Sequence, residues 1–394
     1  MKRDTVLTHA GRYPRQNHGI VNPPVYHAST VLYPNLDAYE AAQKKREYGK
    51  TFYGLSGTPT TFSFEEAVAK LEGAFRARAV GSGLAAITAP LVGCLKAGDH
   101  LLMVDNTYAP SRRFCDGVLK RYGVETTYYD PGIGADVARL FKPNTRVLFM
   151  EAPGSLTFEM QDIPAMVAAA RKAGIVTMID NTWASPYYFR PIEHGVDISI
   201  QAATKYLCGH SDVIMGTVAS NEALADKVDA AVRDLGFFAS PDDCYLVMRG
   251  MRTMAVRLPR HWETSLKLAR WLREQPEVDR VYHPALPEDP GHALWKRDFE
   301  GSTGLFSVGF KAIPRDGLAA FVDGMKLFGM GASWGGFESL VLPANPAPIR
   351  TATSWKAPGP LLRIHAGLED PDDLIADLDA AFGRLRVVLG GGKA

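Results

Sequence analysis

The sequence predicts an α/β protein with a mostly parallel sheet in a large domain, followed by a smaller C-terminal α/β domain. Between about residues 64 and 218, apolar runs of strand length alternate with amphipathic runs of helix length. The strand-length runs are continuously apolar, which is typical of parallel strands that are covered on both faces. The chain of 394 residues is long enough for two or three domains with cores of their own.

The first 57 residues are predicted to form an N-terminal arm that contacts a neighbouring subunit. Prolines at positions 14, 23, 24 and 34 stand among polar and aromatic residues, and helical spacing occurs only at 36–46. Segments of this kind commonly lie across a partner chain in an oligomer. We therefore expect the arm at 1–57, the large domain at 58–245 and the small domain at 246–394.

Strands and helices are expected to alternate along the large domain. The predicted strands lie at 77–80, 100–104, 146–150, 175–179, 197–200 and 213–218. The predicted helices lie at 84–96, 110–122, 135–140 and 163–172. In the C-terminal region, helical spacing at 243–274 precedes a Pro-rich passage, strands at 302–310 and 361–365, and a final helix at 372–389.

Composition and charge argue against several classes of protein. Lys and Arg total 44 against 43 Asp and Glu, a formal net charge of +1, and the two signs are interleaved, unlike in a nucleic-acid-binding protein. The longest mostly apolar run, 83–95, is too short to span a bilayer, and no secretory signal is evident. The 4 cysteines are far apart and lack zinc-site spacing. We expect a cytoplasmic protein without a metal, nucleic acid or membrane partner.

Three features at predicted strand ends carry candidate chemistry, and each has a plain structural alternative. The segment VGSGL at 80–84 offers backbone N–H groups and a helix N-terminus to an anion, or it is only a tight turn. Asp180 follows a strand and is suited to a cation or to proton transfer, or it caps a helix. Lys205 follows the next strand after apolar and small residues that favour a Schiff-base nucleophile, or it is a solvated surface charge.

Together these features match what pyridoxal phosphate (PLP) requires. The cofactor needs an anion site for its phosphate, an acid for its protonated pyridine nitrogen and a lysine that forms an imine. A parallel sheet places all three at one edge. Tyr108, just past the strand at 100–104, adds an aromatic face for stacking on the ring, or it is ordinary loop packing. A nicotinamide dehydrogenase is a further reading, but no complete Gly-x-Gly-x-x-Gly follows a strand.

The chain resembles the cysteine and methionine metabolism family of PLP-dependent enzymes. The resemblance rests on DNTW at 180–183, QAATKYLCGHSD at 201–212, SWGG at 333–336 and RIHAGLED at 363–370, in this order along nearly the whole chain. It implies the aspartate aminotransferase fold of PLP-dependent transferases and a small amino-acid substrate. It also implies a homo-oligomer whose active sites belong to a dimer, with dimers pairing into a tetramer.

The resemblance further implies a role for each site residue. Lys205 would bind the cofactor covalently and carry a proton from the substrate Cα to the leaving sulfur. Asp180 would pair with the pyridine nitrogen, and Tyr108 would stack on the ring and assist the exchange of lysine for substrate. The phosphate would be held by the Gly83 and Leu84 amides, the Thr204 hydroxyl and Tyr53, which would reach over from the neighbouring subunit. Arg363 would clamp the substrate α-carboxylate, in a pocket completed by Ser333 and Trp334.

The same resemblance decides the expected reaction and exposes one departure. Trp183, the Gly-Ser pair at 154–155 and Trp334 favour a carbon–sulfur lyase that performs β-elimination on cystathionine or related S-substituted cysteines. The products would be homocysteine or another thiol, pyruvate and ammonia. A γ-lyase or γ-synthase is the alternative, and a PLP-binding protein with a mainly regulatory role is another. Leu55 stands where the family usually has a phosphate-binding arginine, so weaker cofactor binding is expected.

Overall fold

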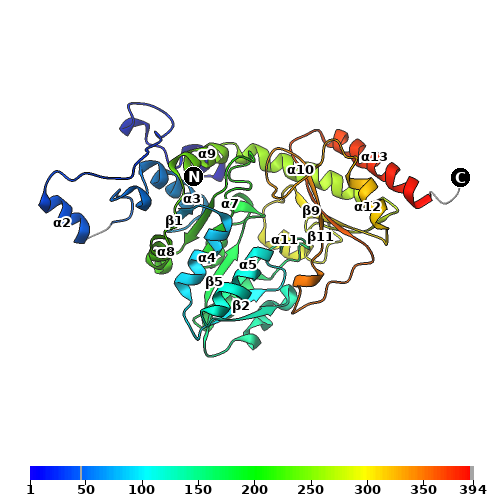
Figure 1. The fold of residues 1–394 in the computed structure, drawn as a ribbon, viewed down its shortest axis with the longest axis horizontal. Coiled ribbons are helices and arrows are strands. Elements are labelled where there is room, and N and C mark those ends of the chain that lie inside the picture. Colours follow the sequence, from blue (N-terminus) through cyan, green and yellow to red (C-terminus); the bar gives the residue numbers. More distant parts are fainter. Residues whose placement is uncertain (45–46, 391–394) are drawn as a thin grey trace.

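The computed structural model describes residues 1–44 and 47–390, and two β-sheets organise it (Figure 1). The larger sheet has seven strands in the order β1-β7-β6-β5-β4-β2-β3. Their bounds are β1 Arg76–Val80, β2 His100–Val104, β3 Glu125–Tyr129, β4 Thr145–Glu151, β5 Val176–Asp180, β6 Ile198–Gln201 and β7 Gly216–Ser220. Neighbouring strands from β2 to β6 pair in parallel, and β7 runs antiparallel to β1 and β6. The predicted mostly parallel sheet is confirmed.

Two strands of the larger sheet differ from the sequence prediction, each for a physical reason. β3 was not predicted, because its sequence ETTYY has no continuous apolar run and it lies at the sheet edge, where most of its residues are partly exposed. β7 begins at Gly216, later than the predicted start at 213. The apolar residues before it, Val213 and Met215, are buried but lie in the loop that follows Lys205.

Helices pack on both faces of the larger sheet. Alternate residues of β2 show this directly, since Leu101 and Met103 belong to one apolar core and Leu102 and Val104 to another. The helices are α3 Pro59–Glu72, α4 Gly83–Cys94, α5 Ala109–Phe114, α6 Ile163–Lys172, α7 Ser185–Tyr188 and α8 Glu222–Asp234. α3, α7 and α8 are additional to the predicted helices. A π-helical turn continues α5, and the predicted helix at 135–140 is part of a 3₁₀ segment.

The C-terminal region folds around a second sheet of five strands in the order β10-β11-β12-β9-β8. Its strands are β8 Val278–Tyr282, β9 Leu305–Phe310, β10 Gly329–Met330, β11 Leu340–Ala344 and β12 Leu361–His365. Its helices are α9 Pro241–Met251, α10 Met254–Arg273, α11 His292–Asp298, α12 Arg315–Val322 and α13 Pro371–Gly390. A separate apolar core lies between this sheet and the helices α10, α12 and α13. The smaller α/β unit is thus confirmed, while the boundary at 245/246, which falls inside α9, stays a prediction.

Most of the N-terminal arm extends away from the body of the molecule, with α2 (Leu36–Lys44) at its far end, while the N-terminus itself lies against the body (Figure 1). Its first helix, α1 Arg3–His9, was not predicted and packs against α3 and α10, where Val6 and Leu7 are buried. The predicted helix is α2 Leu36–Lys44, which has no buried residue, and its last two expected residues, 45 and 46, lie outside the described residues. Several apolar side chains of the arm are exposed, among them Leu32 and Leu36.

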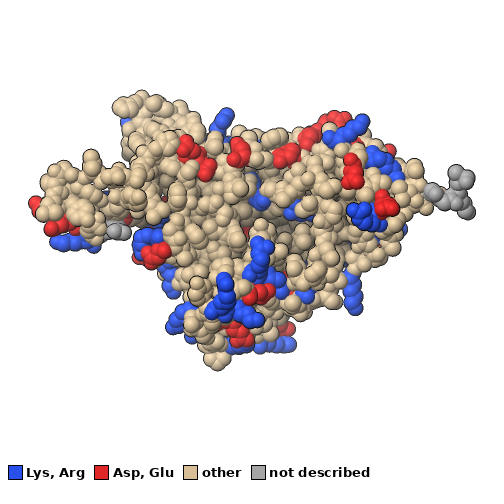
Figure 2. Space-filling model, viewed as in Figure 1, with Lys and Arg blue, Asp and Glu red and all other residues tan. Residues whose placement is uncertain are grey.

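The surface is mixed in charge. Figure 2 shows acidic and basic side chains interspersed on the visible face. Within residues 1–44 and 47–390, no helix is long and apolar enough to cross a membrane. In the same part of the chain, no group of three or more His, Cys, Asp or Glu side chains is placed to hold a metal ion.

Candidate active site

Three neighbouring parallel strands end in polar side chains at one edge of the larger sheet. β4 ends at Glu151, β5 at Asp180 and β6 at Gln201. Glu151 lies opposite Asp180 in the register of the parallel ladder. The segments that follow parallel strands converge at the same edge, which is where ligands bind in sheets of this type. Tyr108, after β2, and Lys205, after β6, both belong to such segments.

The amine of Lys205 lies against the C-terminal domain. Its Nζ donates a hydrogen bond to the Ser333 hydroxyl at 2.5 Å and lies 5.4 Å from the centre of the Trp334 ring. The pKa of Lys205 is lowered to about 8, first by burial and then by the charge of Arg363, while Asp180 acts in the opposite direction. A larger fraction of this amine is therefore unprotonated at neutral pH than in an ordinary lysine. That state is the one needed for imine formation.

Asp180 is oriented by its own strand end. Its Oδ1 accepts hydrogen bonds from the Thr182 backbone N–H at 3.0 Å and from the Thr182 hydroxyl at 2.5 Å. The same hydroxyl accepts from the backbone N–H of Ala202 at 2.8 Å, which ties the ends of β5 and β6 together. Burial raises the pKa of Asp180, and the Thr182 bonds and the Lys205 charge oppose that rise. The bonds that it accepts within the described chain all go to Oδ1, which leaves Oδ2 for a ligand.

Glu151 is a second buried acid beside Asp180, and the sequence reasoning missed it. Its Oε2 accepts from the Tyr108 backbone N–H at 2.7 Å and from the Thr107 hydroxyl at 3.0 Å. Burial raises the pKa of Glu151 well above its usual range, and the charge of Asp180 raises it further. We therefore assign the proton to Glu151 and the negative charge to Asp180. Glu151 ends its strand just as Asp180 does, so the same reasoning from the carboxyl ends of parallel strands predicts it.

Tyr108 presents a neutral aromatic ring at the rim of the sheet. The residue is 45% exposed, and its backbone is fixed by the hydrogen bond to Glu151. Burial raises the pKa of Tyr108, the charge of Asp180 raises it further, and Arg113 and Arg363 oppose the rise. The phenol therefore keeps its proton at neutral pH. An exposed, protonated ring with a fixed backbone is suited to stacking on a planar ligand.

The start of α4 packs directly against the segment that carries Lys205. A Cβ on Gly83 would lie 2.6 Å from the Cβ of Ala202, so only glycine allows this approach. Ser82 caps the helix by accepting from the Ala85 N–H at 3.0 Å. The N–H groups of Gly83 and Leu84 lie in the first turn, ahead of the first intrahelical hydrogen bond, and are suited to an anion.

Thr204 lies in the same region, but its hydroxyl is already engaged. Its Oγ1 accepts from the Met215 backbone N–H at 2.9 Å and donates to the Met215 carbonyl at 3.1 Å. These bonds hold the loop between Lys205 and β7 in place. The predicted contact between Thr204 and the phosphate requires the hydroxyl proton to turn away from Met215, and it stays a prediction.

Arg363, Ser333 and Trp334 form the C-terminal wall beside Lys205. Arg363 lies in β12 and donates from Nη2 to the Ser333 carbonyl at 2.9 Å. Ser333 and Gly335 have positive φ angles of 78° and 88°. A Cβ added to Gly335 would lie only 3.0 Å from the Lys205 Cα, so the loop passes close to the backbone of Lys205. This sharp loop brings Trp334 onto Tyr206, with ring centres 5.4 Å apart. The three predicted substrate-binding residues are thus brought together.

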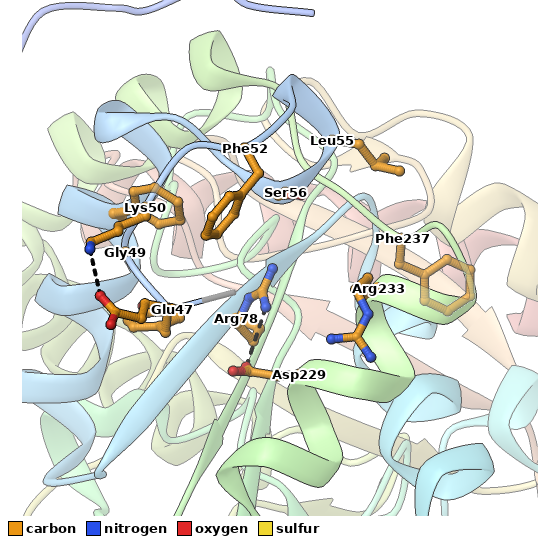
Figure 3. A pocket seen from close by; sticks show the side chains of 12 residues that line it. Glu47, Gly49, Lys50, Phe52, Leu55, Ser56, Arg78, Asp229, Arg233 and Phe237 are labelled. Atoms are coloured by element: carbon orange, nitrogen blue, oxygen red, sulfur yellow. Dashed lines mark hydrogen bonds and ion pairs between the residues drawn. The ribbon is translucent and has the colours of Figure 1, made fainter. Parts of the chain in front are cut away.

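Tyr53 and Leu55 are not brought to this site within one chain. Tyr53 is 52% exposed on the arm, and its hydroxyl lies 3.4 Å from that of Ser29. Leu55 lines a small pocket of about 80 Å³ between the arm, β1 and α8. Figure 3 shows Arg78 and Arg233 in the same pocket, where Arg78 pairs with Asp229 at 3.3 Å.

Of the three positions that favour β-elimination, Trp334 is the one that contacts Lys205. Trp183 is 5% exposed and donates from Nε1 to the Leu305 carbonyl at 2.9 Å, so it belongs to the apolar core between the two sheets. Gly154 is required by packing, since a Cβ there would lie 1.8 Å from the Asn106 side-chain nitrogen. These two residues shape the surroundings of the site and do not contact the Lys205 amine.

The chain is similar to known proteins over nearly its whole length. The family model described as Cys/Met metabolism PLP-dependent enzyme matches residues 4–383. A putative cystathionine β-lyase of Rhizobium johnstonii is 51% identical over 96% of this chain and 95% of its own length. Cystathionine β-lyase MetC of Escherichia coli is 45% identical over 98% and 99%. The crystal structure of a cystathionine γ-synthase from Xanthomonas oryzae pv. oryzae, with aminoacrylate and cysteine, has a TM-score of 0.89 at 30% identity, covering 98% of this chain and 99% of that one.

Proposed function

The chain belongs to the Cys/Met metabolism family of PLP-dependent enzymes, and from this membership and the site we propose that it catalyses β-elimination from cystathionine or a related S-substituted cysteine. The products would be homocysteine or another thiol, pyruvate and ammonia. The observation that carries the proposal is the Lys205 amine, whose pKa is lowered to about 8 and which lies beside Ser333 and Trp334.

The residues at the site fit PLP. The cofactor supplies a ring that stabilises negative charge on the substrate Cα. Asp180 has a free Oδ2 and a burial penalty that a protonated ring nitrogen would offset. The first-turn N–H groups of α4 and the helix dipole suit a phosphate, and Gly83 lets them approach the Lys205 segment. Tyr108 offers the stacking face.

Lys205 has two tasks in this proposal. Its Nζ would hold the cofactor covalently before substrate binds. Its freed Nζ then takes the proton from the substrate Cα and delivers it to the sulfur as the Cβ–S bond breaks. A pKa of about 8 suits both halves of this transfer, because the amine accepts a proton near neutral pH and gives it up again.

Arg363 is the proposed clamp for the substrate α-carboxylate. Within the described part of the chain, one of its N–H groups donates to the Ser333 carbonyl and the others have no partner, so the rest of the planar fork can make a bidentate pair. Burial lowers the pKa of Arg363, yet the guanidinium remains charged at neutral pH. The same charge helps to lower the pKa of Lys205. The clamp and the proton carrier are therefore electrostatically linked.

The β-elimination is favoured over the γ-type reactions by two supporting observations. The two relatives reported above, at 51% and 45% identity, are named β-lyases, whereas the γ-synthase structure is 30% identical. Trp334, one of the positions that favours β-elimination, contacts the Lys205 amine through its ring. The product of cystathionine cleavage separates the two branches, since γ-elimination yields 2-oxobutyrate.

A second copy of the chain is part of the proposal. Ile20, Val21, Leu32 and Leu36 of the arm are 55% to 88% exposed, and a partner subunit would cover such residues. We propose that the arm lies across that partner and places Tyr53 at the partner's phosphate site. The active sites would then belong to a dimer, and two dimers would form a tetramer.

Replacement of Lys205 tests the proposed function. Wild-type protein with PLP is expected to show a visible absorption band that shifts when cystathionine is added, and to release pyruvate. Lys205→Ala is expected to lose the lysine-dependent band and turnover and to keep the wild-type oligomer, as measured by light scattering. Turnover that survives in Lys205→Ala would contradict the proposal. Wild-type protein that binds PLP and releases neither pyruvate nor 2-oxobutyrate would favour a mainly regulatory role.

A further inference from the structure

A cluster of buried charged groups joins the C-terminal sheet to the rim of the larger sheet. Its centre is Asp105, which directly follows β2 and is 0% exposed. Its Oδ1 accepts from the Thr351 N–H at 2.9 Å and the Thr351 hydroxyl at 3.2 Å. Its Oδ2 accepts from the Thr353 N–H at 2.9 Å and the Thr353 hydroxyl at 2.6 Å. Both threonines belong to residues 345–360, which connect β11 to β12 and which we call the clasp loop.

Two arginines complete the cluster. Arg112 donates from Nη2 to the Asp105 Oδ1 at 2.5 Å and from Nη1 to the Thr351 hydroxyl at 3.1 Å. Arg350 is held by Glu159 at 2.8 Å, and its Nη1 is 4.0 Å from the Asp105 Oδ2. Burial would raise the pKa of Asp105, but the hydrogen bonds from residues 351–353 outweigh it and lower the pKa to about 2. Asp105 is therefore charged at every pH at which the enzyme would work.

The large-domain end of this cluster leads to Tyr108. Asn106 donates to the Glu159 Oε2 at 2.9 Å, so the residue after Asp105 is tied to the partner of Arg350. The next two residues, Thr107 and Tyr108, are held by Glu151. Residues 105–108 thus form one fixed segment with Asp105 at one end and the Tyr108 ring at the other.

The C-terminal end of the cluster leads to Arg363. β11 and β12 pair antiparallel, and Arg363 lies opposite Leu342 near the middle of that pair. The clasp loop connects these two strands, so the hydrogen bonds that hold the loop on Asp105 also restrain the position of β12, which carries Arg363. The cluster therefore contacts, through short segments, both walls of the pocket.

We propose that Asp105 is a positioning residue, which holds the clasp loop on the rim of the sheet and thereby fixes Arg363 relative to Tyr108 and Lys205. Its effect would fall on the affinity for the α-carboxylate of the substrate, so the proposal rests on the proposed role of Arg363. Asp105 itself would touch neither substrate nor cofactor. Buried ion pairs give little net stability compared with apolar residues of the same size. The Asp105 carboxylate accepts five directional hydrogen bonds from Arg112, Thr351 and Thr353. We therefore expect the main effect of these bonds to be on the position of the clasp loop and not on the free energy of unfolding.

The test compares two ligands that differ by the carboxylate alone, L-alanine and ethylamine. Binding of each to the PLP-loaded enzyme is followed by the change in visible absorption. In Asp105→Asn, the Kd for L-alanine is expected to rise about tenfold or more, and the Kd for ethylamine to stay within about twofold. Thr353→Val, which removes only the 2.6 Å bond, is expected to show the same pattern with a smaller rise.

Asp197→Asn is a matched control at the opposite edge of the sheet. Asp197 precedes β6 and accepts from the Thr177 N–H, the Thr177 hydroxyl and the Asn221 amide, each at 2.8 Å. Its replacement removes a comparable set of bonds without touching the clasp loop. L-alanine binding is expected to remain at the wild-type level in this variant. Hydrogen exchange in apoenzyme adds a readout free of cofactor, since peptides covering 345–360 should exchange faster in Asp105→Asn and at the wild-type rate in Asp197→Asn.

The possible outcomes separate the two proposals. Wild-type enzyme that binds L-alanine no more tightly than ethylamine overturns the role of Arg363 and the clasp proposal with it. A wild-type preference that Asp105→Asn retains overturns the clasp proposal alone, as does an equal loss for both ligands or an equal loss in Asp197→Asn. Where Asp105→Asn fails to fold, Thr353→Val decides by the same criteria.

Discussion

Replacing Gly83 by alanine is expected to disturb both the fold and the phosphate site. The added Cβ would lie 2.6 Å from the Cβ and 3.1 Å from the Cα of Ala202. Carbon atoms in contact are usually about 3.5 to 4.0 Å apart, so the start of α4 must move by roughly 1 Å. Overpacking of this kind costs about 1 to 3 kcal/mol of unfolding free energy. The moved N–H groups of Gly83 and Leu84 should also weaken cofactor binding by about tenfold.

Urea unfolding and titration of apoenzyme with PLP measure these two effects. Gly383→Ala is the matched control, because Gly383 lies in α13 with no atom within 4 Å of its added Cβ, and it should gain about 0.5 to 1 kcal/mol. The double variant Gly83→Ala/Ala202→Gly should recover part of both losses, since it removes the closest atom. A Gly83→Ala protein with wild-type stability and wild-type PLP affinity would refute the reasoning.

Three other substitutions or conditions give further tests. The rate at which apoenzyme binds PLP covalently should rise about tenfold per pH unit and become constant above about pH 8. Only the unprotonated Lys205 amine reacts, and its pKa is lowered to about 8. A rate that keeps rising to pH 10 would contradict this expectation. Leu55→Arg should tighten PLP binding by about tenfold to a hundredfold, the equivalent of one charged hydrogen bond, and an unchanged affinity in the titration would count against the arm's role. Thr182→Val should lower kcat about tenfold with little change in PLP content, because Asp180 loses its hydroxyl partner, and a wild-type kcat would remove Thr182 from the site.

The parts of this site that follow from strand order could be predicted from the sequence. Continuous apolar runs identified the parallel strands, and the rule that their carboxyl ends meet at one edge placed Asp180 and Lys205 together. The same rule also places Glu151, at the end of β4, at this edge. The additional strand β3 escaped because an edge strand with polar residues carries no such signal.

Other features depend on contacts between segments that are distant in sequence. The engagement of Thr204 by Met215 and the burial of Trp183 under Leu305 are decided by loop packing, which residue types alone do not encode. The hydrogen bonds that Asp105 accepts from Thr351 and Thr353 join residues about 250 positions apart, one beside each sheet, and no local sequence pattern predicts them. Tyr53 lies on the exposed arm, and its proposed contact is with a second copy of the chain, so the structure of one chain does not include it.

The most direct measurement is the identity of the oxo acid released from cystathionine by the purified, PLP-loaded enzyme. Coupled assays specific for pyruvate and for 2-oxobutyrate, run with wild-type protein and with Lys205→Ala, give the answer. β-Elimination predicts pyruvate from the wild type, in equal amount to homocysteine, and none from the variant. Release of 2-oxobutyrate would assign the chain to the γ branch, and release of neither from cystathionine or any other S-substituted cysteine would contradict the proposed function.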